Sequence, residues 1–422
     1  MQALRGTKDI LPNEILLWRN IYNTALKICS LYNYHEIRTP IVENTSLFER
    51  SIGNETDIVN KEMYSFTDQG EREITLRPEG TASIARSFIS NKLYNQRQTN
   101  KLWYMGPMFR YERPQSGRQR QFHQLGLECI GSIEPLADAE VIRIAIRILE
   151  ELKIENYGLE INSIGNLEER QIYQYKLIEY LEKYKDDLDT DSQKRLYSNT
   201  LRILDSKDKK TQDIISYAPS LEKYLDKKSV KHFKKLCSYL SKMNISYNIN
   251  TKLVRGLDYY NYTAFEISHR QLKSQNTICG GGRYDSLIKS LGGPQTPSVG
   301  WAMGIERLLL ASKSLSINQS LKPDVYVAVQ GELAELEIWS ILSILEKGNI
   351  KFELDLQANS FQKQVRKATK LGISICIIIG DTEANNGKVT IKLLNEYTQK
   401  TVDSYKIIEE IKKYQQNLTM SR

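Results

Sequence analysis

The stretch from Leu102 to Ile130 constrains the fold of this chain more than any other. Two runs of strand-forming composition, Leu102 to Glu112 and Phe122 to Ile130, flank a polar loop that contains Pro114 and Gly117. This pattern is typical of an antiparallel hairpin with a long loop. Because side chains alternate along a strand, we predict one polar and one apolar face. The polar face carries Arg110 and Glu112 on the first strand and Phe122, Gln124, Gly126 and Glu128 on the second, and the apolar face carries Leu125, Leu127 and Cys129.

The polar face has two interpretations. An antiparallel sheet often leaves one face in water, but polar side chains that other elements cover need partners. The loop favours the second interpretation, because Arg113, Arg118 and Arg120 lie beside this face and clustered guanidinium groups suit the capture of phosphate or carboxylate. Phe122 can stack on a flat ring such as adenine. We therefore expect a ligand on this face.

The same stretch resembles motif 2 of the class II aminoacyl-tRNA synthetases, and in detail that of the histidyl-tRNA synthetases. The resemblance rests on Phe109 to Glu112, a basic loop, and Arg120 to Gln124. It implies an α+β catalytic domain around an antiparallel sheet, ATP as a substrate, and the attachment of histidine to tRNA. The rest of the chain tests whether other motifs of the family are present.

Length and composition fit a globular protein of several domains. The 422 residues allow roughly three domains, or two with an insertion. The strongest apolar run, Ile373 to Ile379, carries Ser374 and is too short to span a membrane. The first residues lack the pattern of a signal or transit peptide, so we expect synthesis in the compartment of use. This compartment is the bacterial cytosol or the stroma of a plastid.

Charge and cysteine content limit the partners. The net charge of +8 favours a polyanionic partner. The five cysteines are widely separated, form no CxxC pair and are accompanied by four histidines. We therefore expect reduced thiols, with no disulfide framework and no metal site of the protein's own.

The N-terminal region predicts a helix and a strand. Apolar positions from Pro12 to Tyr32 recur at helical spacing, which indicates an amphipathic helix. The strand-like segment HEIRTPIVE follows, and Pro40 within it cannot donate to a sheet ladder. One interpretation is an ordinary edge strand. The other is class II motif 1, which the resemblance implies forms a homodimer interface.

Glu79 also has two interpretations. It lies in ITLRPEGT, between a short strand and a helix, where a carboxylate can stabilise the helix N-terminus or hold an ammonium group. The segment resembles the family's loop for the α-amino group of histidine, which the resemblance assigns to Glu79, Gly80 and Thr81.

Residues 167–250 read as a helical insertion. Between residues 171 and 250 there are 16 Lys or Arg against 11 Asp or Glu. A solvated helical surface explains this charge without any function, and we favour that interpretation over contact with RNA. In the resembled family an insertion here covers the acceptor end of the tRNA.

Three later motifs strengthen the resemblance. LVRGLDYY (253–260) and CGGGRYDSL (279–287) resemble the two histidine-specific stretches of the family, although Ser286 stands where glycine is commoner. VGWAMGIERLLL (299–310) resembles motif 3, and Gly300 and Gly304 leave room for a ligand against the strand. The resemblance assigns Arg255 to the reacting carboxylate and the α-phosphate, Tyr259 and Tyr260 to the histidine pocket, and Arg307 to adenine and the γ-phosphate.

From Pro323 strands and helices alternate, which predicts a separate α/β domain with a mostly parallel sheet. Four basic residues gather on one predicted helix, Lys363, Arg366, Lys367 and Lys370. The placement resembles the anticodon-binding domain of the family. We expect a catalytic domain over 1–320, with the insertion at 167–250, and an anticodon-binding domain over 321–422.

The resemblance implies the remaining roles. Arg110 and Arg255 stabilise the reaction with Mg²⁺ carried by ATP, and Glu112, Phe122 and Arg307 complete the ATP site. Gln124 assists at the ammonium group, and Glu128 and Tyr260 pair with the imidazole. Arg113 and Gln115 contact tRNA(His). His123 is turned away by strand alternation and is expected to be structural.

Two other functions share parts of this pattern. The synthetase-like regulatory subunit of ATP phosphoribosyltransferase has a similar core, but the basic loop, Arg255 and the extra α/β domain argue against it. A class II synthetase for another amino acid is opposed by the two histidine-type stretches.

Overall fold

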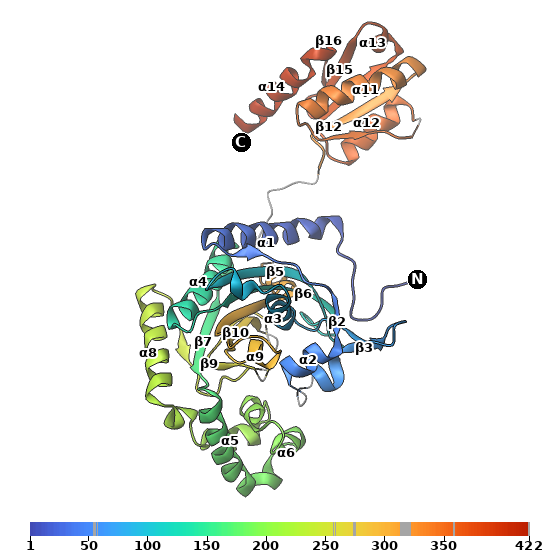
Figure 1. The fold of residues 1–422 in the computed structure, drawn as a ribbon. Coiled ribbons are helices and arrows are strands. Elements are labelled where there is room, and N and C mark those ends of the chain that lie inside the picture. The colour runs from blue at the N-terminus through green and yellow to red at the C-terminus, as the bar shows by residue number, and fades with distance from the viewer. Residues whose placement is uncertain are drawn as a thin grey trace. The chain divides into compact units, whose positions relative to one another are not determined.

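The computed structural model describes residues 1–53, 56, 58–255, 257, 259–272, 276–312, 322–357 and 359–420 (Figure 1). Contacts divide the chain into two compact units, Met1–Ser316 and Ile317–Arg422. Among the residues just given, no helix is long and apolar enough to cross a membrane.

The larger unit is built on an eight-stranded sheet in the order β1-β5-β6-β11-β10-β9-β7-β8. β1 pairs with β5 and β8 pairs with β7 in parallel, and the other pairs are antiparallel. The strands are β1 (His35–Glu36), β5 (Asn100–Phe109), β6 (Gln121–Ile130), β7 (Tyr157–Ser163), β8 (Asn248–Ile249), β9 (Asn261–His269), β10 (Thr277–Arg283) and β11 (Ser298–Gly304).

The predicted hairpin is formed by β5 and β6, but its first strand is shorter than expected. β5 ends at Phe109, so the expectation that Arg110 and Glu112 share a strand face is wrong. The ladder stops because Glu112 N–H turns back to the carbonyl of Arg110 at 2.8 Å, while Tyr111 N–H donates to Glu62 O at 2.7 Å. Both side chains therefore project from a loop at the strand end.

Helices cover one face of this sheet (Figure 1), and the residues that meet there are apolar. Leu125, Leu127 and Cys129 on β6 are buried in its core, as the alternation predicted. Trp301 on β11 joins this core and donates its indole N–H to the carbonyl of Val141 at 2.8 Å. The covering helices are α1 (Pro12–Leu31), α4 (Pro135–Glu151), α8 (Lys227–Lys242) and α10 (Ile305–Ala311).

The other face meets α3 (Thr81–Ser90), α9 (Leu287–Ser290) and the predicted insertion, which is helical. The helices of the insertion begin at capping residues. Asn166 and Glu169 form a capping box at the first helix. At three later helices the side chains of Asp189, Asp208 and Asp226 accept hydrogen bonds from backbone N–H groups of the first turn. The elements are α5 (Leu167–Leu181), η3 (Glu182–Asp187), α6 (Thr190–Arg195), η4 (Thr200–Asp205), α7 (Lys209–Ser216), η5 (Leu221–Tyr224) and α8.

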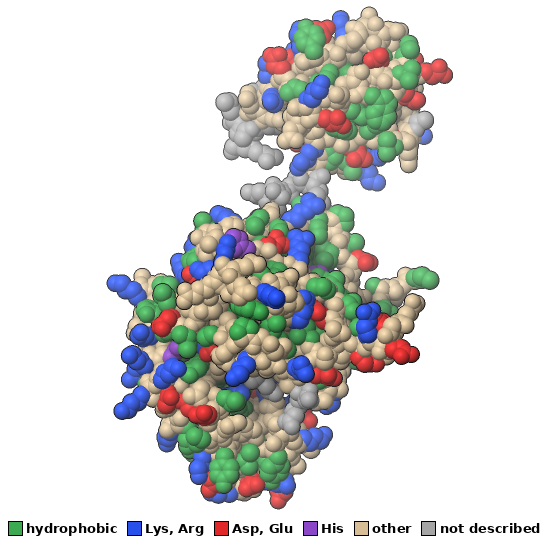
Figure 2. Space-filling view, viewed as in Figure 1, with side chains coloured by type: hydrophobic (Ala, Val, Ile, Leu, Met, Phe, Trp, Pro, Cys, Tyr) green, Lys and Arg blue, Asp and Glu red, His purple; other side chains and the backbone are tan. Residues whose placement is uncertain are grey.

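Lysines gather on the exposed side of α8, at the left edge of the larger unit in Figure 2. The helix carries no acid between its first and last residues, and its buried positions are Ser229, Leu236 and Leu240. The exposed lysines are Lys227, Lys228, Lys231, Lys234, Lys235 and Lys242.

The segment HEIRTPIVE forms two short strands rather than the single strand expected. β1 lies at an edge of the large sheet, whereas β2 (Val42–Asn44) lies at an edge of a three-stranded sheet. Pro40 falls between them, and Arg77 holds this break by donating to Thr39 O at 3.0 Å. The remaining elements here are α2 (Thr45–Ile52), η1 (Ile58–Glu62), β3 (Tyr64–Thr67), β4 (Glu73–Leu76) and η2 (Leu93–Asn95).

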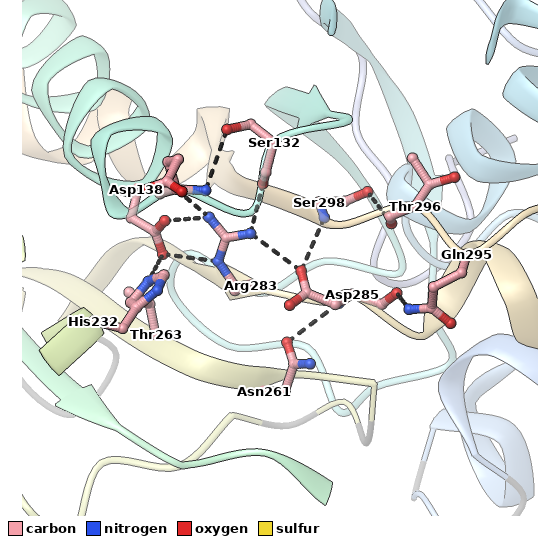
Figure 3. A network of polar contacts seen from close by, with 11 residues as sticks. Ser132, Asp138, His232, Asn261, Thr263, Arg283, Asp285, Gln295, Thr296 and Ser298 are labelled. Carbon is pink, nitrogen blue, oxygen red and sulfur yellow. Dashed lines mark hydrogen bonds and ion pairs between the residues drawn. The ribbon is translucent and has the colours of Figure 1, made fainter. Parts of the chain in front are cut away.

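The end of β10 is fixed by a buried polar network (Figure 3). The guanidinium of Arg283 is fully buried and pairs with both carboxylate oxygens of Asp138. It also donates to Asp285 at 3.2 Å and to the carbonyl of Ser132 at 2.7 Å. Burial alone would raise the pKa of Asp138, but Arg283 and His232 outweigh burial and hold that pKa well below its usual range.

The smaller unit is an α/β domain with a mixed sheet in the order β13-β12-β14-β15-β16. The prediction of a mostly parallel sheet is wrong, because β15 and β16 add antiparallel pairs beyond β14. β16 is too polar to be recognised from its sequence. The elements are β12 (Val325–Gln330), α11 (Glu332–Lys347), β13 (Phe352–Leu354), α12 (Phe361–Lys370), β14 (Ile375–Gly380), α13 (Asp381–Asn385), β15 (Lys388–Leu393), β16 (Thr398–Asp403), η7 (Ser404–Lys406) and α14 (Ile407–Met420).

The predicted basic helix is α12. Lys363, Arg366 and Lys370 are exposed, whereas Lys367 lies 3.7 Å from Asp355. Three of the four basic side chains are thus presented to solvent.

Candidate active site

A cavity of about 390 Å³ opens on the polar face of the large sheet. It lies where the β5–β6 hairpin, the start of α3, the segment before β9, and the ends of β10 and β11 meet. The structure brings ten predicted site residues together in its walls: Glu79, Thr81, Arg110, Glu112, Phe122, Gln124, Arg255, Tyr259, Tyr260 and Arg307.

At one end, Glu79 caps helix α3. Its carboxylate accepts from Thr81 N–H at 2.7 Å and from Ala82 N–H at 2.6 Å. These contacts match the helix-terminus interpretation, while the carboxylate also lines the cavity. Burial raises the pKa of Glu79, although the two backbone donors and Arg110 oppose the rise.

Glu128 lies beneath the cavity and is fully buried. One carboxylate oxygen accepts from the Thr81 hydroxyl at 2.7 Å and the other accepts from the Tyr284 hydroxyl. Burial raises the pKa of Glu128 to about 8, because these donors are neutral and cannot replace hydration fully. Gly300 makes the space, since a Cβ there would lie 1.8 Å from the carboxylate.

Tyr284 and Tyr104 belong to this site although the motifs did not single them out as site residues. Tyr104 lies under the cavity, where a Cβ at Gly80 or Gly126 would approach its ring to 2.2 or 2.1 Å. The facing glycines were a signal for this buried ring, since Gly126 is the cross-strand partner of Tyr104. Gly80 therefore acts by making room for Tyr104, and it does not line the cavity itself.

Several buried polar atoms near the cavity have no hydrogen-bond partner among the described residues. They are Tyr104 Oη, Gln124 Oε1, Tyr259 Oη and Arg255 Nε. Because burying such groups without a partner is costly, their convergence is what a site built for a polar ligand requires.

Arg255 also lines the cavity. Its Nη1 donates to Glu266 at 2.8 Å, and its guanidinium lies over Gly280, where a Cβ would come within 2.0 Å. Burial opposes its charge, but the nearby Tyr260 and Glu266 hold the pKa of Arg255 above its usual value. Gly256 and Asp258 of the same motif lie outside the described residues.

Other guanidinium groups also line the cavity. Arg110 donates to Pro78 O at 2.8 Å and lies 5.3 Å from the Phe122 ring. Arg307 on α10 donates to Thr277 O at 2.6 Å. Arg118 lies 3.2 Å from Glu112, which holds this acid at the cavity edge.

The loop arginines do not act as one cluster, contrary to expectation. Arg118 lines the cavity, but Arg120 stacks on Tyr111 with 3.8 Å to the ring centre. Arg113 and Gln115 are exposed on the loop, outside the cavity walls. The loop spreads because its backbone pairs with other segments, as when Arg120 N–H donates to Gly6 O at 2.7 Å.

His123 points away from the cavity, as strand alternation predicted. Its Nδ1 lies 3.0 Å from Glu306, and its ring meets Trp18 edge-on at 4.6 Å.

Solved structures share this fold. That of apo histidyl-tRNA synthetase from S. aureus has a TM-score of 0.81 and 35% identity, covering 98% of this chain and 100% of that one. An ATP phosphoribosyltransferase regulatory subunit/histidyl-tRNA synthetase from Bacillus halodurans has a TM-score of 0.65 at 21% identity, covering 90% of this chain and 98% of that one, which shows the fold alone. The chain thus has the fold of a class II aminoacyl-tRNA synthetase, as predicted.

Sequence comparisons narrow the class. A family model described as "Histidyl-tRNA synthetase" matches residues 6–308, and one described as "Anticodon binding domain" matches residues 324–414. A chloroplastic histidine–tRNA ligase of Gracilaria tenuistipitata is 63% identical, covering 98% of this chain and 99% of that protein. A histidine–tRNA ligase of Gloeothece citriformis is 49% identical, covering 100% of this chain and 98% of that protein. The chain belongs to the histidyl-tRNA synthetase family, and the predicted function, an aminoacyl-tRNA ligase for histidine, is confirmed.

Proposed function

We propose that this chain activates L-histidine with ATP in the cavity described above and then transfers the histidyl group to the 3′ end of tRNA(His). The observation that carries this assignment is the polarity of the cavity. The cavity is lined both by the buried carboxylate of Glu79 and by the guanidinium groups of Arg110, Arg255 and Arg307. We take the part beside Glu79 as the carboxylate end and the part beside Arg307 as the guanidinium end. An amino acid with a cationic or polar side chain suits the first end, and a nucleotide triphosphate suits the second.

Histidine binds at the carboxylate end. Glu79, Gln124 and Thr81 receive its ammonium group, while Gly80 makes room for the Tyr104 ring. Glu128 and Tyr260 pair with the imidazole, and Tyr259 closes the pocket. Because the Thr81 hydroxyl is already bonded to Glu128, Thr81 links the two subsites. A pocket that pairs both ring nitrogens rejects apolar side chains, since its own polar groups would be left without partners.

ATP binds at the guanidinium end. Arg110 and Arg307 contact phosphates, Glu112 lies near the adenine, and Phe122 and Arg307 enclose the purine ring. Mg²⁺ arrives as an ion held by the ATP phosphates.

Both steps are nucleophilic substitutions without a protein nucleophile. The histidine carboxylate attacks the α-phosphorus, the bond to the bridging oxygen breaks, and pyrophosphate leaves. A ribose hydroxyl of tRNA then forms an ester with the acyl carbon, and AMP leaves with the electron pair and the hydroxyl proton. Arg110 and Arg255 stabilise the charge that develops on the α-phosphate.

The outer parts of the chain hold the tRNA. We assign residues 1–320 to catalysis, 167–250 to the helical insertion, and 321–422 to anticodon binding. Arg113 and Gln115, exposed on the hairpin loop, contact tRNA(His). Exposed Lys363, Arg366 and Lys370 on α12 are suited to phosphates.

The chain acts as a homodimer in a bacterial cytosol or a plastid stroma. The Pro40 segment supplies the dimer contact, and relatives come from red algal chloroplasts and cyanobacteria. Light scattering checks the dimer: a particle of twice 48.8 kDa supports it, and a single-chain mass at working concentration rejects it.

Histidine-dependent exchange of labelled pyrophosphate into ATP, measured without tRNA, tests the activation step. Exchange with histidine but with no other amino acid supports the assignment. No exchange from folded protein would point instead to a regulatory paralogue. Arg255→Ala should lower the exchange rate by about 100- to 1,000-fold, because it removes the guanidinium at the reacting carboxylate.

A further inference from the structure

Small residues form part of the cavity floor on the large sheet. Across the strands, Gly126 on β6 pairs with Ala302 on β11, and Ala302 pairs with Gly280 on β10. Paired residues in antiparallel strands project to the same face, and both Ala302 and Gly280 line the cavity. Glu266 on β9 is the next cross-strand partner, opposite Gly280. It therefore stands as a long acidic side chain at the border of this floor.

Arg255 lies over the floor and is bonded to Glu266. A Cβ at position 280 would come within 2.0 Å of the guanidinium, so glycine is what leaves this space. Arg255 Nη1 donates to Glu266 Oε2 at 2.8 Å. Within the part of the chain that the structure describes, no other acceptor bonds to the Arg255 side chain, and its buried Nε has no partner. Glu266 therefore fixes one edge of the guanidinium and leaves other donors for a ligand.

Glu266 is itself held in place. Its second oxygen, Oε1, accepts from the Thr277 hydroxyl at 2.5 Å. Thr277 begins β10 and lines the cavity, and its carbonyl accepts from Arg307 at 2.6 Å. Because both carboxylate oxygens have donors, the carboxylate cannot rotate without breaking one of these bonds. The position of Arg255 is thus tied to the start of β10.

One other acid lies close enough to affect Arg255. Asp205 on η4 interacts with the charge of Arg255, but its own ion pair is with Arg202 at 3.9 Å, and its side chain is 67% exposed. Among the described contacts Asp205 makes no hydrogen bond to Arg255. A solvent-screened charge cannot orient a guanidinium as a charge-assisted hydrogen bond does. Glu266 is therefore the carboxylate that decides where the Arg255 guanidinium lies.

We propose that Glu266 is a positioning residue for the activation step, which holds the Arg255 guanidinium on the Gly280 floor to meet the α-phosphate. The inference deepens the proposed function and rests on it, because only there does Arg255 stabilise charge on the α-phosphate. Glu266 does not line the cavity, so it acts through Arg255 and not on the substrates. A long side chain that is fixed before the substrate binds need not be ordered during the reaction, which favours the transition state.

Substitution of Glu266 should lower the rate of activation while leaving substrate binding intact. Glu266→Ala should lower kcat for histidine-dependent pyrophosphate exchange by about 100-fold, because Arg255 loses its fixed position. The KM values for histidine and ATP should stay within about threefold of the wild type, because the lost stabilisation belongs to the transition state. Glu266→Gln keeps an acceptor for Arg255, so it should regain about tenfold of the lost rate.

Glu160→Gln is the matched control. Glu160 on β7 is the cross-strand partner of Glu266 on the same face, and it accepts from Asn250 at 2.7 Å. Neither Glu160 nor Asn250 lines the cavity, so kcat and both KM values should match those of the wild type. A fall in kcat as large as that of Glu266→Gln would show that any change of charge on this face matters, and would overturn the specific role of Glu266.

A double-mutant cycle shows whether Glu266 acts through Arg255. In the Arg255→Ala background, Glu266→Ala should change the exchange rate by less than about threefold, because no guanidinium remains to be positioned. If Glu266→Ala alone does not fold, the cycle is measured with Glu266→Gln, which keeps a polar group beside Thr277. Losses that multiply in the double variant, or a single variant with a raised KM and an unchanged kcat, would overturn the proposal.

The same measurements separate this inference from the proposed function. A folded wild-type chain without histidine-dependent exchange would reject the proposed function, and this inference would fall with it. A wild-type chain that exchanges, together with a Glu266→Ala variant within about threefold of its kcat, would reject the role of Glu266 and leave the proposed function standing.

Discussion

Glu128 and Asp138 are both fully buried carboxylates in the larger unit, yet their surroundings differ in kind. Asp138 meets a guanidinium and an imidazole, so its charge is matched within the fold (Figure 3). Glu128 meets only the hydroxyl groups of Thr81 and Tyr284. The pKa of Asp138 is accordingly lowered and that of Glu128 is raised to about 8.

The difference between these surroundings shows how a buried carboxylate serves either the stability of the fold or the binding of a ligand. A carboxylate with a charged partner stabilises the chain, and its charge is not available to pair with a ligand. A carboxylate with neutral donors is held in place at some cost, and it keeps the capacity to pair with a ligand such as an imidazole. Substitution of Asp138 should therefore lower stability, whereas substitution of Glu128 should lower activity.

The largest effect on stability should come from Asp138→Asn. The change removes the bidentate partner of the buried Arg283 and leaves it only the longer contact to Asp285 among the described carboxylates, so the free energy of unfolding should fall by about 3–5 kcal/mol. Urea unfolding followed by tryptophan fluorescence measures the loss. Replacing both partners, with Asp138→Leu and Arg283→Met, should recover much of it, and a double variant as unstable as Asp138→Asn would contradict the pairing argument.

Glu128→Gln should affect activity instead. Histidine-dependent pyrophosphate exchange should fall by about 100-fold, or about 2.7 kcal/mol, because Gln cannot ionise, whereas Glu128 can give up its proton and pair with the imidazole as a carboxylate. Stability should not fall, since a neutral group replaces a buried carboxylate. Glu140→Gln is the control, because Glu140 on α4 pairs with Lys101 on β5, and neither residue lines the cavity. A stable, fully active Glu128→Gln variant would remove this residue from the pocket.

The pH dependence of stability should separate the two acids. The folded pKa of Glu128 is about 8 against an unfolded value of about 4.3, so between these values the folded state alone holds the proton, and stability falls by about 1.4 kcal/mol per pH unit as pH rises. Asp138 behaves oppositely: its contribution is present above the unfolded pKa of about 3.9 and is lost as pH falls below it.

Chemical unfolding of wild type and Glu128→Gln at pH 6 and pH 8 measures this difference. The wild type should lose about 2 kcal/mol more than the variant over this interval. The loss is smaller than two full pH units would give, because the slope falls off as the pH reaches the folded pKa of about 8. Equal losses in the two proteins would show that Glu128 does not carry the proton.

The smallest effect should come from Tyr284→Phe. Removing one donor to Glu128 should raise the KM for histidine by about tenfold, because the carboxylate is less well oriented and less readily ionised. Tyr34→Phe is the matched control: Tyr34 donates to Glu140 at 3.1 Å on the opposite side of the sheet, so its loss should leave KM unchanged. An equal KM in all three proteins would make Tyr284 structural.

Sequence reasoning succeeded where a local pattern determines the outcome. Alternation along β6 separated Leu125, Leu127 and Cys129 from the cavity residues, because neighbouring side chains on a strand must face opposite ways. Helix starts such as the Asn166 and Glu169 capping box are equally local. The family motifs then carried the enzyme class and the substrate.

Reasoning failed where two distant segments compete for the same backbone groups. β5 stops at Phe109 because Tyr111 N–H pairs with Glu62 O, a contact that no spacing predicts. Arg120 stacks on Tyr111 and leaves the loop cluster. Tyr104 could be placed only once its cross-strand partner, Gly126, was known.

The sequence by itself determined the alternation of the hairpin, the helical insertion, the separate C-terminal unit and the family, since all of these depend on residue order alone. Only the tertiary structure decided which buried acid has a charged partner and which does not. That choice depends on side chains contributed by segments far apart in the chain: Arg283 reaches Asp138 and Tyr284 reaches Glu128. Arg283 and Tyr284 are consecutive at the end of β10, yet one contacts Asp138 and the other contacts Glu128. Because both carboxylates are buried, the pKa of each depends on its nearest donors. Asp138 therefore serves stability and Glu128 serves the ligand.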